Sequence, residues 1–302
     1  MATGTLDRRK RGVGSRISAA LWRRSGVRGT LLLSPPLLWL ILVYLTPLVV
    51  LLITAFWRIN DFTIKIEHVW NLGNVRTVFG NGTYRAITLR TIGMASLVTI
   101  TDAILAFPVA YYMARVATRR TQTALFVAIL LPLWASYLAR VYAWILILSH
   151  DGTLNWMLGK LGIGGTNIAY TNTAMWLVFS YVWLPFMLIP VYTALERIPS
   201  SYLEASSDLG GREWRTLRSV ILPLALPGLV AGSIFTFALT LGDYITPILV
   251  GGAGSSMVGN VIYSNFGTAG NVPLAAAFAL VPIIVMAVYL WLAKRLGAFE
   301  AL

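Results

Sequence analysis

Long apolar runs separated by short polar segments dominate this chain. A helix needs about 20 consecutive apolar residues to cross a bilayer, and six runs reach that length with few ionisable residues inside them. The pattern predicts an all-α polytopic membrane protein with six transmembrane helices. We expect the spans near residues 30–57, 90–114, 123–148, 173–195, 224–249 and 274–293.

The basic segment before the first span, residues 1–28, is too long for the start of a signal peptide, and no small-residue cleavage site follows the apolar run. We therefore expect the first span to be retained as a membrane anchor. On this interpretation residues 1–28 form a basic cytoplasmic tail and residues 29–302 form a transmembrane domain.

The net charge of +13 could suggest nucleic-acid binding, but the distribution of the basic residues does not. Lysine and arginine are concentrated before the first span, after the second, between the fourth and fifth, and after the sixth. The positive-inside rule then places both termini in the cytoplasm, an N-in/C-in topology. The bilayer, not nucleic acid, is the partner that this charge indicates.

The sequence offers little covalent chemistry. It has no cysteine, no GxxxxGK[ST] phosphate loop, no HExxH and no GxSxG, and its two histidines, His68 and His150, fall outside the expected spans. These absences argue against a Walker-type ATP site, a histidine-ligated metal and a histidine relay. We expect no catalytic residues, no metal and no cofactor.

The charged segment 196–223 interrupts the apolar pattern between the fourth and fifth spans. Ser201 to Glu204 suggests a capping box at the start of a helix, and Gly210-Gly211 suggests its end. A second short helix would follow and stop at Leu222-Pro223. A helix, turn and helix at the cytoplasmic surface suits docking to another protein, although an amphipathic segment resting on lipid headgroups would show the same pattern.

This segment resembles the EAA loop of type I ABC-importer permeases, whose pattern is E-A-A, three residues, G, nine residues, I-x-L-P. Serine replaces the third residue and valine replaces the isoleucine. The stretches "LPLWASYLARVYAWILIL", "DGTLN" and "GDYITPILVGG" also resemble the spermidine/putrescine-type permeases. In that family the loop docks into a cytoplasmic ATPase, which implies coupling roles for Glu204, Ala205, Ser206, Asp208, Gly210, Leu222 and Pro223.

The resemblance implies a type I (MetI-like) fold and a non-catalytic, multi-pass inner-membrane permease subunit of a binding-protein-dependent importer. Its expected partners are two cytoplasmic ATPases, a second permease that is homologous or identical, and an outer solute-binding protein. A polyamine such as spermidine or putrescine is the expected solute, with an opine, an amino-phosphonate or another small organic solute as alternatives. An ion-driven secondary carrier and an intramembrane enzyme remain rival classes.

Ionisable residues within spans are costly and need a physical reason. Asp102, in the second span, could attract a cationic solute or pair with Arg140 of the third. Asp243, near the outer end of the fifth span, could line a translocation path or bond to neighbouring groups that hold a bend. Aromatic side chains could bind a cation by their π faces or serve as interface anchors. The candidate path residues are Asp102, Arg140, Tyr142, Trp183, Asp243 and Tyr244.

Overall fold

The structure is a computed structural model that describes residues 25–295 except 61, 62, 64, 163, 164, 166 and 167. The expected tail therefore lies largely outside the described residues. The chain divides into two compact units between Ile53 and Thr54.

The first unit is one long apolar helical segment. It comprises α2 (Ser25–Trp39), the π-helical η1 (Leu40–Leu45) and α3 (Thr46–Thr54), whose last residue already belongs to the second unit. Most of its described side chains are exposed within the single chain. The helix continues past Pro35 and Pro36 and widens to π geometry just after them. The Thr46 hydroxyl donates to the Ile41 carbonyl within this wide turn.

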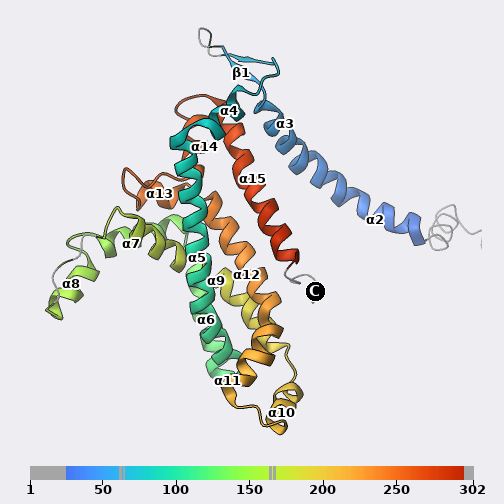
Figure 1. Ribbon diagram of the computed structural model, residues 1–302, viewed down its shortest axis with the longest axis vertical. Helices are drawn as coiled ribbons and strands as arrows, with labels where there is room; N and C mark the ends of the chain where they lie inside the picture. Colours follow the sequence, from blue (N-terminus) through green and yellow to red (C-terminus); the bar gives the residue numbers. More distant parts are fainter. Residues whose placement is uncertain (1–24, 61–62, 64, 163–164, 166–167, 296–302) are drawn as a thin grey trace, which may run out of the picture. The chain divides into compact units, whose positions relative to one another are not determined.

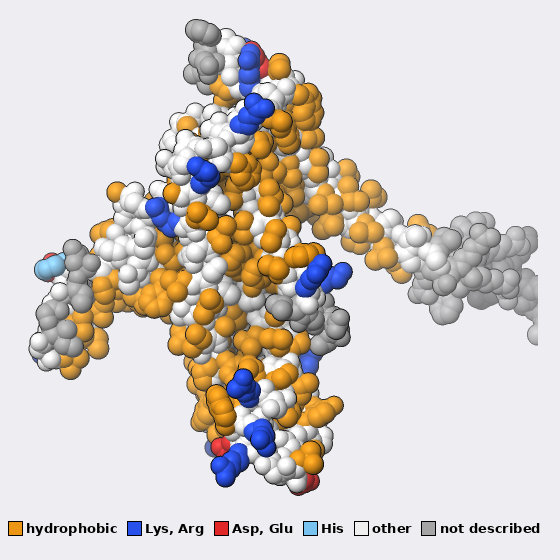
Figure 2. All heavy atoms as spheres, viewed as in Figure 1, with side chains coloured by type: hydrophobic (Ala, Val, Ile, Leu, Met, Phe, Trp, Pro, Cys, Tyr) orange, Lys and Arg blue, Asp and Glu red, His pale blue; other side chains and the backbone are white. Residues whose placement is uncertain are grey.

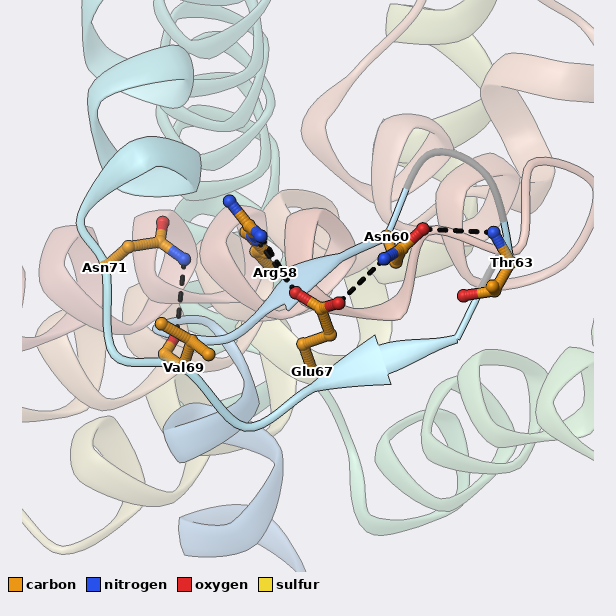
Figure 3. A network of polar contacts seen from close by, with 6 residues as sticks. All are labelled: Arg58, Asn60, Thr63, Glu67, Val69 and Asn71. Atoms are coloured by element: carbon orange, nitrogen blue, oxygen red, sulfur yellow. Dashed lines mark hydrogen bonds and ion pairs between the residues drawn. The ribbon is translucent and has the colours of Figure 1, made fainter.

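The second unit begins with a small hairpin and a short helix. Strands β1 (Arg58–Ile59) and β2 (Ile66–Glu67) pair antiparallel, and α4 (Gly73–Gly80) follows. Figure 3 shows Glu67 at the centre of this hairpin, where its carboxylate accepts hydrogen bonds from Asn60 at 2.7 Å and from Arg58 at 3.0 Å. The hydrogen bonds to Asn60 and Arg58 lower the pKa of Glu67.

Three long helices form the core of the second unit. They are α5 (Gly82–Arg115), α9 (Asn172–Glu196) and α12 (Leu222–Gly242), and each packs on the other two. Two glycines let α12 approach α9 closely: a Cβ added to Gly228 would lie 2.4 Å from the Cβ of Ala194, and one added to Gly232 would lie 2.8 Å from the Met187 carbonyl oxygen. Helix α15 (Val272–Arg295) packs on α12, α14 (Val258–Phe266) and α4 (Figure 1).

The third apolar run is not one straight helix. The sequence predicts a span over 123–148, whereas the structure has α6 (Arg119–Trp134), then α7 (Tyr137–Leu148) and α8 (Thr153–Lys160), with a bend of 96° between α6 and the helices that follow. The break falls at Ala135 and Ser136, whose backbones are extended. Pro132 lies one turn before it, and a proline cannot donate the backbone hydrogen bond of a regular helix.

The segment between α9 and α12 contains α10 (Ser200–Asp208), α11 (Glu213–Thr216) and the π-helical η2 (Leu217–Ile221). The expected capping box is wrong, because α10 begins at Ser200 with Pro199 at its N-cap and has no side-chain cap. The expected stop at Leu222-Pro223 is also wrong: the helix runs continuously from Glu213 to Gly242. Pro223 lies in the first turn of α12, directly after the wide π turn, where a missing N–H is tolerated.

Candidate functional sites

The cytoplasmic end of α9 is fixed to the end of α5. The guanidinium of Arg115, the last residue of α5, donates to the carbonyls of Leu195 at 2.6 Å and Ile198 at 2.7 Å. These bonds satisfy acceptors that the end of a helix leaves free. In the same region the Tyr192 hydroxyl donates to Glu196 at 2.8 Å. The segment that follows therefore starts from a rigid base.

Helix α10 presents most of its residues to solvent. Leu203 is half-buried and packs against a buried cluster that includes Ile221. Glu204, Ala205 and Asp208 are exposed, and Leu209 just beyond the helix is 88% exposed.

The predicted glycine turn after α10 is confirmed. Gly210 has φ +75°, the left-handed conformation that favours glycine. Gly211 cannot hold a side chain either, because a Cβ there would lie 2.6 Å from the Ser206 carbonyl oxygen. Between α10 and the next helix lies a cavity of about 320 Å³, whose walls include Tyr202, Leu209 and Arg215.

Figure 2 shows hydrophobic side chains along the helices of the second unit, and several lysine or arginine side chains at the end that carries α10 and α11. This distribution matches the cytoplasmic side that the positive-inside rule assigns to the segment.

Asp243 is fully engaged in hydrogen bonds at the end of α12. Its Oδ1 accepts the backbone N–H groups of Ile245 at 2.7 Å and Thr246 at 3.2 Å, at the start of α13 (Ile245–Leu249). Its Oδ2 accepts the hydroxyls of Tyr137 and Thr246. The carboxylate therefore holds the bend between α12 and α13 and joins it to α7, which favours the second of the two interpretations of this residue.

Asp102 does not pair with Arg140, and this expectation is corrected. Asp102 is completely buried on α5 and neither carboxylate oxygen has a hydrogen-bond partner among the described residues. Two nitrogens of the Arg140 guanidinium are likewise buried without a partner. Arg140 lies on α7, after the bend, and α7 packs on α9 and α13.

Other buried polar atoms without partners lie on the helices that enclose Asp102. Ser180 on α9 lies near the Asp102 carboxylate without forming a hydrogen bond to it. Trp183 follows one turn later on the same helix. Thr236, completely buried on α12, is one turn from Gly232, which abuts Met187. Buried polar groups of this kind normally have a protein or water partner.

The remaining candidate path residues do not share one site. Trp183 is 9% exposed and stacks on Tyr137 with ring centroids 5.6 Å apart. Tyr142 on α7 is exposed, and Tyr244 stacks on Tyr263 at 4.6 Å. Five cavities between described residues, of about 320 to 710 Å³, are lined by residues other than the six candidates. Among the described residues no cluster of histidine, aspartate and glutamate suits a metal ion.

Sequence reasoning missed Tyr137, the residue that connects Asp243 to Trp183. The sequence offers little indication of this role, because Tyr137 is one of several aromatic residues in its apolar run and the break before α7 was not predicted. Ser180 and Thr236 were missed because serine and threonine are common in membrane helices, where their hydroxyls bond to their own backbone or to a neighbouring helix.

Residues 106–298 match the family described as the binding-protein-dependent transport system inner membrane component, and the chain belongs to this family. It is an inner-membrane permease subunit of an ABC importer, which does not favour the secondary-carrier interpretation and is consistent with a non-enzymatic subunit.

Curated relatives agree with this assignment. The chain is 46% identical over 315 residues to the inner membrane ABC transporter permease protein YdcU of Escherichia coli (strain K12), covering 100% of both chains. It is 32% identical over 263 residues to the spermidine/putrescine transport system permease protein PotB of Salmonella typhimurium (strain LT2), covering 85% of this chain and 91% of the relative.

Solved structures share the fold. A chain of a bacterial ABC transporter involved in the import of the acidic polysaccharide alginate superposes with a TM-score of 0.73 at 16% identity, covering 93% of this chain and 99% of the other. A chain of the alginate transporter in complex with its alginate pentasaccharide-bound periplasmic protein gives 0.74 at 16% identity, covering 95% and 98%. At this identity the likeness concerns the fold alone.

Proposed function

We propose that this permease forms the translocation path for a small organic polycation of the spermidine/putrescine kind. The observation that carries the proposal is the similarity to PotB permeases over 85% of the chain. The remaining partners follow from the importer class: two cytoplasmic ATPases, a second permease subunit that is homologous or identical, and an outer solute-binding protein.

Segment 196–223 transmits the movement of the ATPase to the membrane helices in this proposal. Its support is the exposure of Glu204, Ala205 and Asp208 on a helix anchored through Leu203, and the continuity of the following helix with α12. Leu222 and Pro223 lie in that continuous helix, so displacement of α10 has a direct route into a transmembrane span.

Aromatic faces near the outer side of the second unit suit a polyamine better than the buried carboxylates do. Tyr244 is 36% exposed and its stacking partner Tyr263 lines a cavity of about 570 Å³. An ammonium group is attracted to such a ring face by the ring quadrupole. Asp243 already accepts four hydrogen bonds and so contributes structure rather than a free charge.

The test is ATP hydrolysis by the reconstituted four-component complex, titrated with putrescine, spermidine, an opine and an amino-phosphonate. The proposal expects stimulation by the polyamines only. Stimulation by the amino-phosphonate alone would refute the polyamine assignment. Arg140, two of whose guanidinium nitrogens have no hydrogen-bond partner among the described residues, would then be the first candidate for binding the phosphonate.

A matched pair of substitutions tests the aromatic surface. Tyr244→Phe keeps the ring face and Tyr244→Leu removes it. We expect the leucine variant to raise the KM for putrescine uptake roughly two- to fivefold, as for an exposed cation–π contact, and the phenylalanine variant to stay near the parent. Equal values for both variants would remove Tyr244 from the path.

A further inference from the structure

The hydroxyls of Ser206 and Thr216 meet between the two helices of segment 196–223. Ser206 lies on α10 and Thr216 ends α11, and their oxygens are 2.8 Å apart in a partly buried position. This is the side-chain hydrogen bond that the structure gives between the two helices. Serine stands where the family pattern has alanine, so the pattern itself does not supply this bond.

Two backbone hydrogen bonds hold the turn next to this pair. The N–H of Gly211 donates to the Ser206 carbonyl at 2.8 Å, and that of Gly210 donates to the Ser207 carbonyl at 2.8 Å. A Cβ at Gly211 would lie 2.6 Å from the Ser206 hydroxyl oxygen and 3.2 Å from that of Thr216. Ser206 on α10, Gly211 in the turn and Thr216 on α11 therefore lie in close contact with one another.

Thr216 also belongs to the helix that becomes a transmembrane span. Helix α11, η2 and α12 are continuous from Glu213 to Gly242. A force applied to α10 therefore reaches the span by two routes, the backbone of the Gly210-Gly211 turn and the side-chain contact between Ser206 and Thr216. Glycine has no Cβ to restrict its backbone angles, so the side-chain contact adds a constraint that the two backbone hydrogen bonds of the turn do not supply.

We propose that the Ser206–Thr216 hydrogen bond is a brace that makes α10 and the α11–α12 helix move as one body, and that these two are positioning residues for coupling. The proposal rests on the coupling role proposed above for this segment. It assigns the transmission step to a contact within the permease, distinct from the surface of α10 that meets the ATPase.

The brace itself is tested on the permease alone, in lipid nanodiscs. The chain contains no cysteine, so spin labels at Ser207→Cys and Arg218→Cys report the distance between the two helices without background. We expect Thr216→Val, which is nearly isosteric but lacks the hydroxyl, to broaden the distance distribution, and Thr216→Ser to restore a narrow one. An unchanged distribution in the valine variant would overturn the brace.

Coupling is then measured in the reconstituted complex as solute moved per ATP hydrolysed. Ser206→Ala and Thr216→Val should each lower this ratio roughly two- to tenfold, the range expected for the loss of one hydrogen bond, while the amount of bound ATPase stays at the parent level. The double variant should be no worse than either single variant, because the two share one bond, and Thr216→Ser should retain the ratio.

The two readouts separate the two hypotheses. Broadened distances with an unchanged transport ratio would refute the coupling role of the brace. Failure of the parent chain to bind an ATPase would refute the coupling role proposed for the segment, whereas the distance measurement would still decide whether the brace exists.

Discussion

Replacing Asp243 should destabilise the protein rather than alter its affinity for solute. Asp243→Ala removes the acceptor for the backbone N–H groups of Ile245 and Thr246 and for the Tyr137 hydroxyl. Loss of a helix-capping acceptor costs about 1 kcal/mol, and loss of a hydrogen bond between partly buried side chains costs about 1–3 kcal/mol more. We expect a total of about 2–4 kcal/mol.

Thermal unfolding in detergent or nanodiscs measures this cost. A loss of 1 kcal/mol lowers Tm by about 2–4 °C in a chain of this size class, so Asp243→Ala should unfold roughly 5–15 °C earlier. Asp243→Asn keeps one side-chain oxygen as an acceptor and should lose about half as much. Tyr137→Phe removes the phenol alone, and the double variant with Asp243→Ala should lose less than the sum because the two side chains share a bond.

Two outcomes would contradict the structural role of Asp243. An unchanged Tm in Asp243→Ala, together with a large rise in the KM for putrescine, would show that the carboxylate meets solute instead of holding the bend. Strict additivity of Asp243→Ala and Tyr137→Phe would show that the contact between them carries no energy.

Three further outcomes are expected. Glu204→Lys should insert and fold normally, because the residue is exposed, yet copurify several-fold less ATPase; undiminished copurification would contradict its docking role. Gly228→Ala should cost about 1–3 kcal/mol because its Cβ meets Ala194 and a carbonyl, whereas Gly93→Ala, with no atom within 4 Å, should be neutral or slightly stabilising; equal Tm values would refute the close packing of α9 and α12. The lowered pKa of Glu67 means that its hydrogen bonds stabilise the hairpin above its ordinary pKa and stop doing so as the pH falls through the lowered value; the Tm difference between the parent and Glu67→Gln should shrink on acidification, and a constant difference would contradict this.

The membrane architecture follows from the sequence because hydropathy and charge asymmetry are properties of whole segments. The resemblance to type I permeases rested on the motif in segment 196–223. Its Gly210-Gly211 turn appears as expected because Gly210 adopts the left-handed conformation that favours glycine and a Cβ at Gly211 would meet Ser206. The boundaries of that segment were less accessible. Pro223 signals a helix stop in isolation, yet the π turn before it lets the helix continue.

The interior of the candidate path could not be predicted for a different reason. Pairing Asp102 with Arg140 assumed a straight third span, and a bend of 96° between α6 and the helices that follow removes that basis. The partners of Asp243 lie both next to it in sequence and more than a hundred residues away. The hydrophobic pattern of a single sequence does not indicate a contact between residues as far apart as Tyr137 and Asp243.

ATP-dependent uptake tests the central claim most directly. Proteoliposomes would contain this permease with its second permease, ATPase and solute-binding protein, and labelled putrescine would be supplied on the side of the binding protein. The account predicts accumulation only when the ATPase is present and ATP is available to it, and none when the ATPase is omitted. Accumulation driven by an ion gradient without the ATPase would contradict the account.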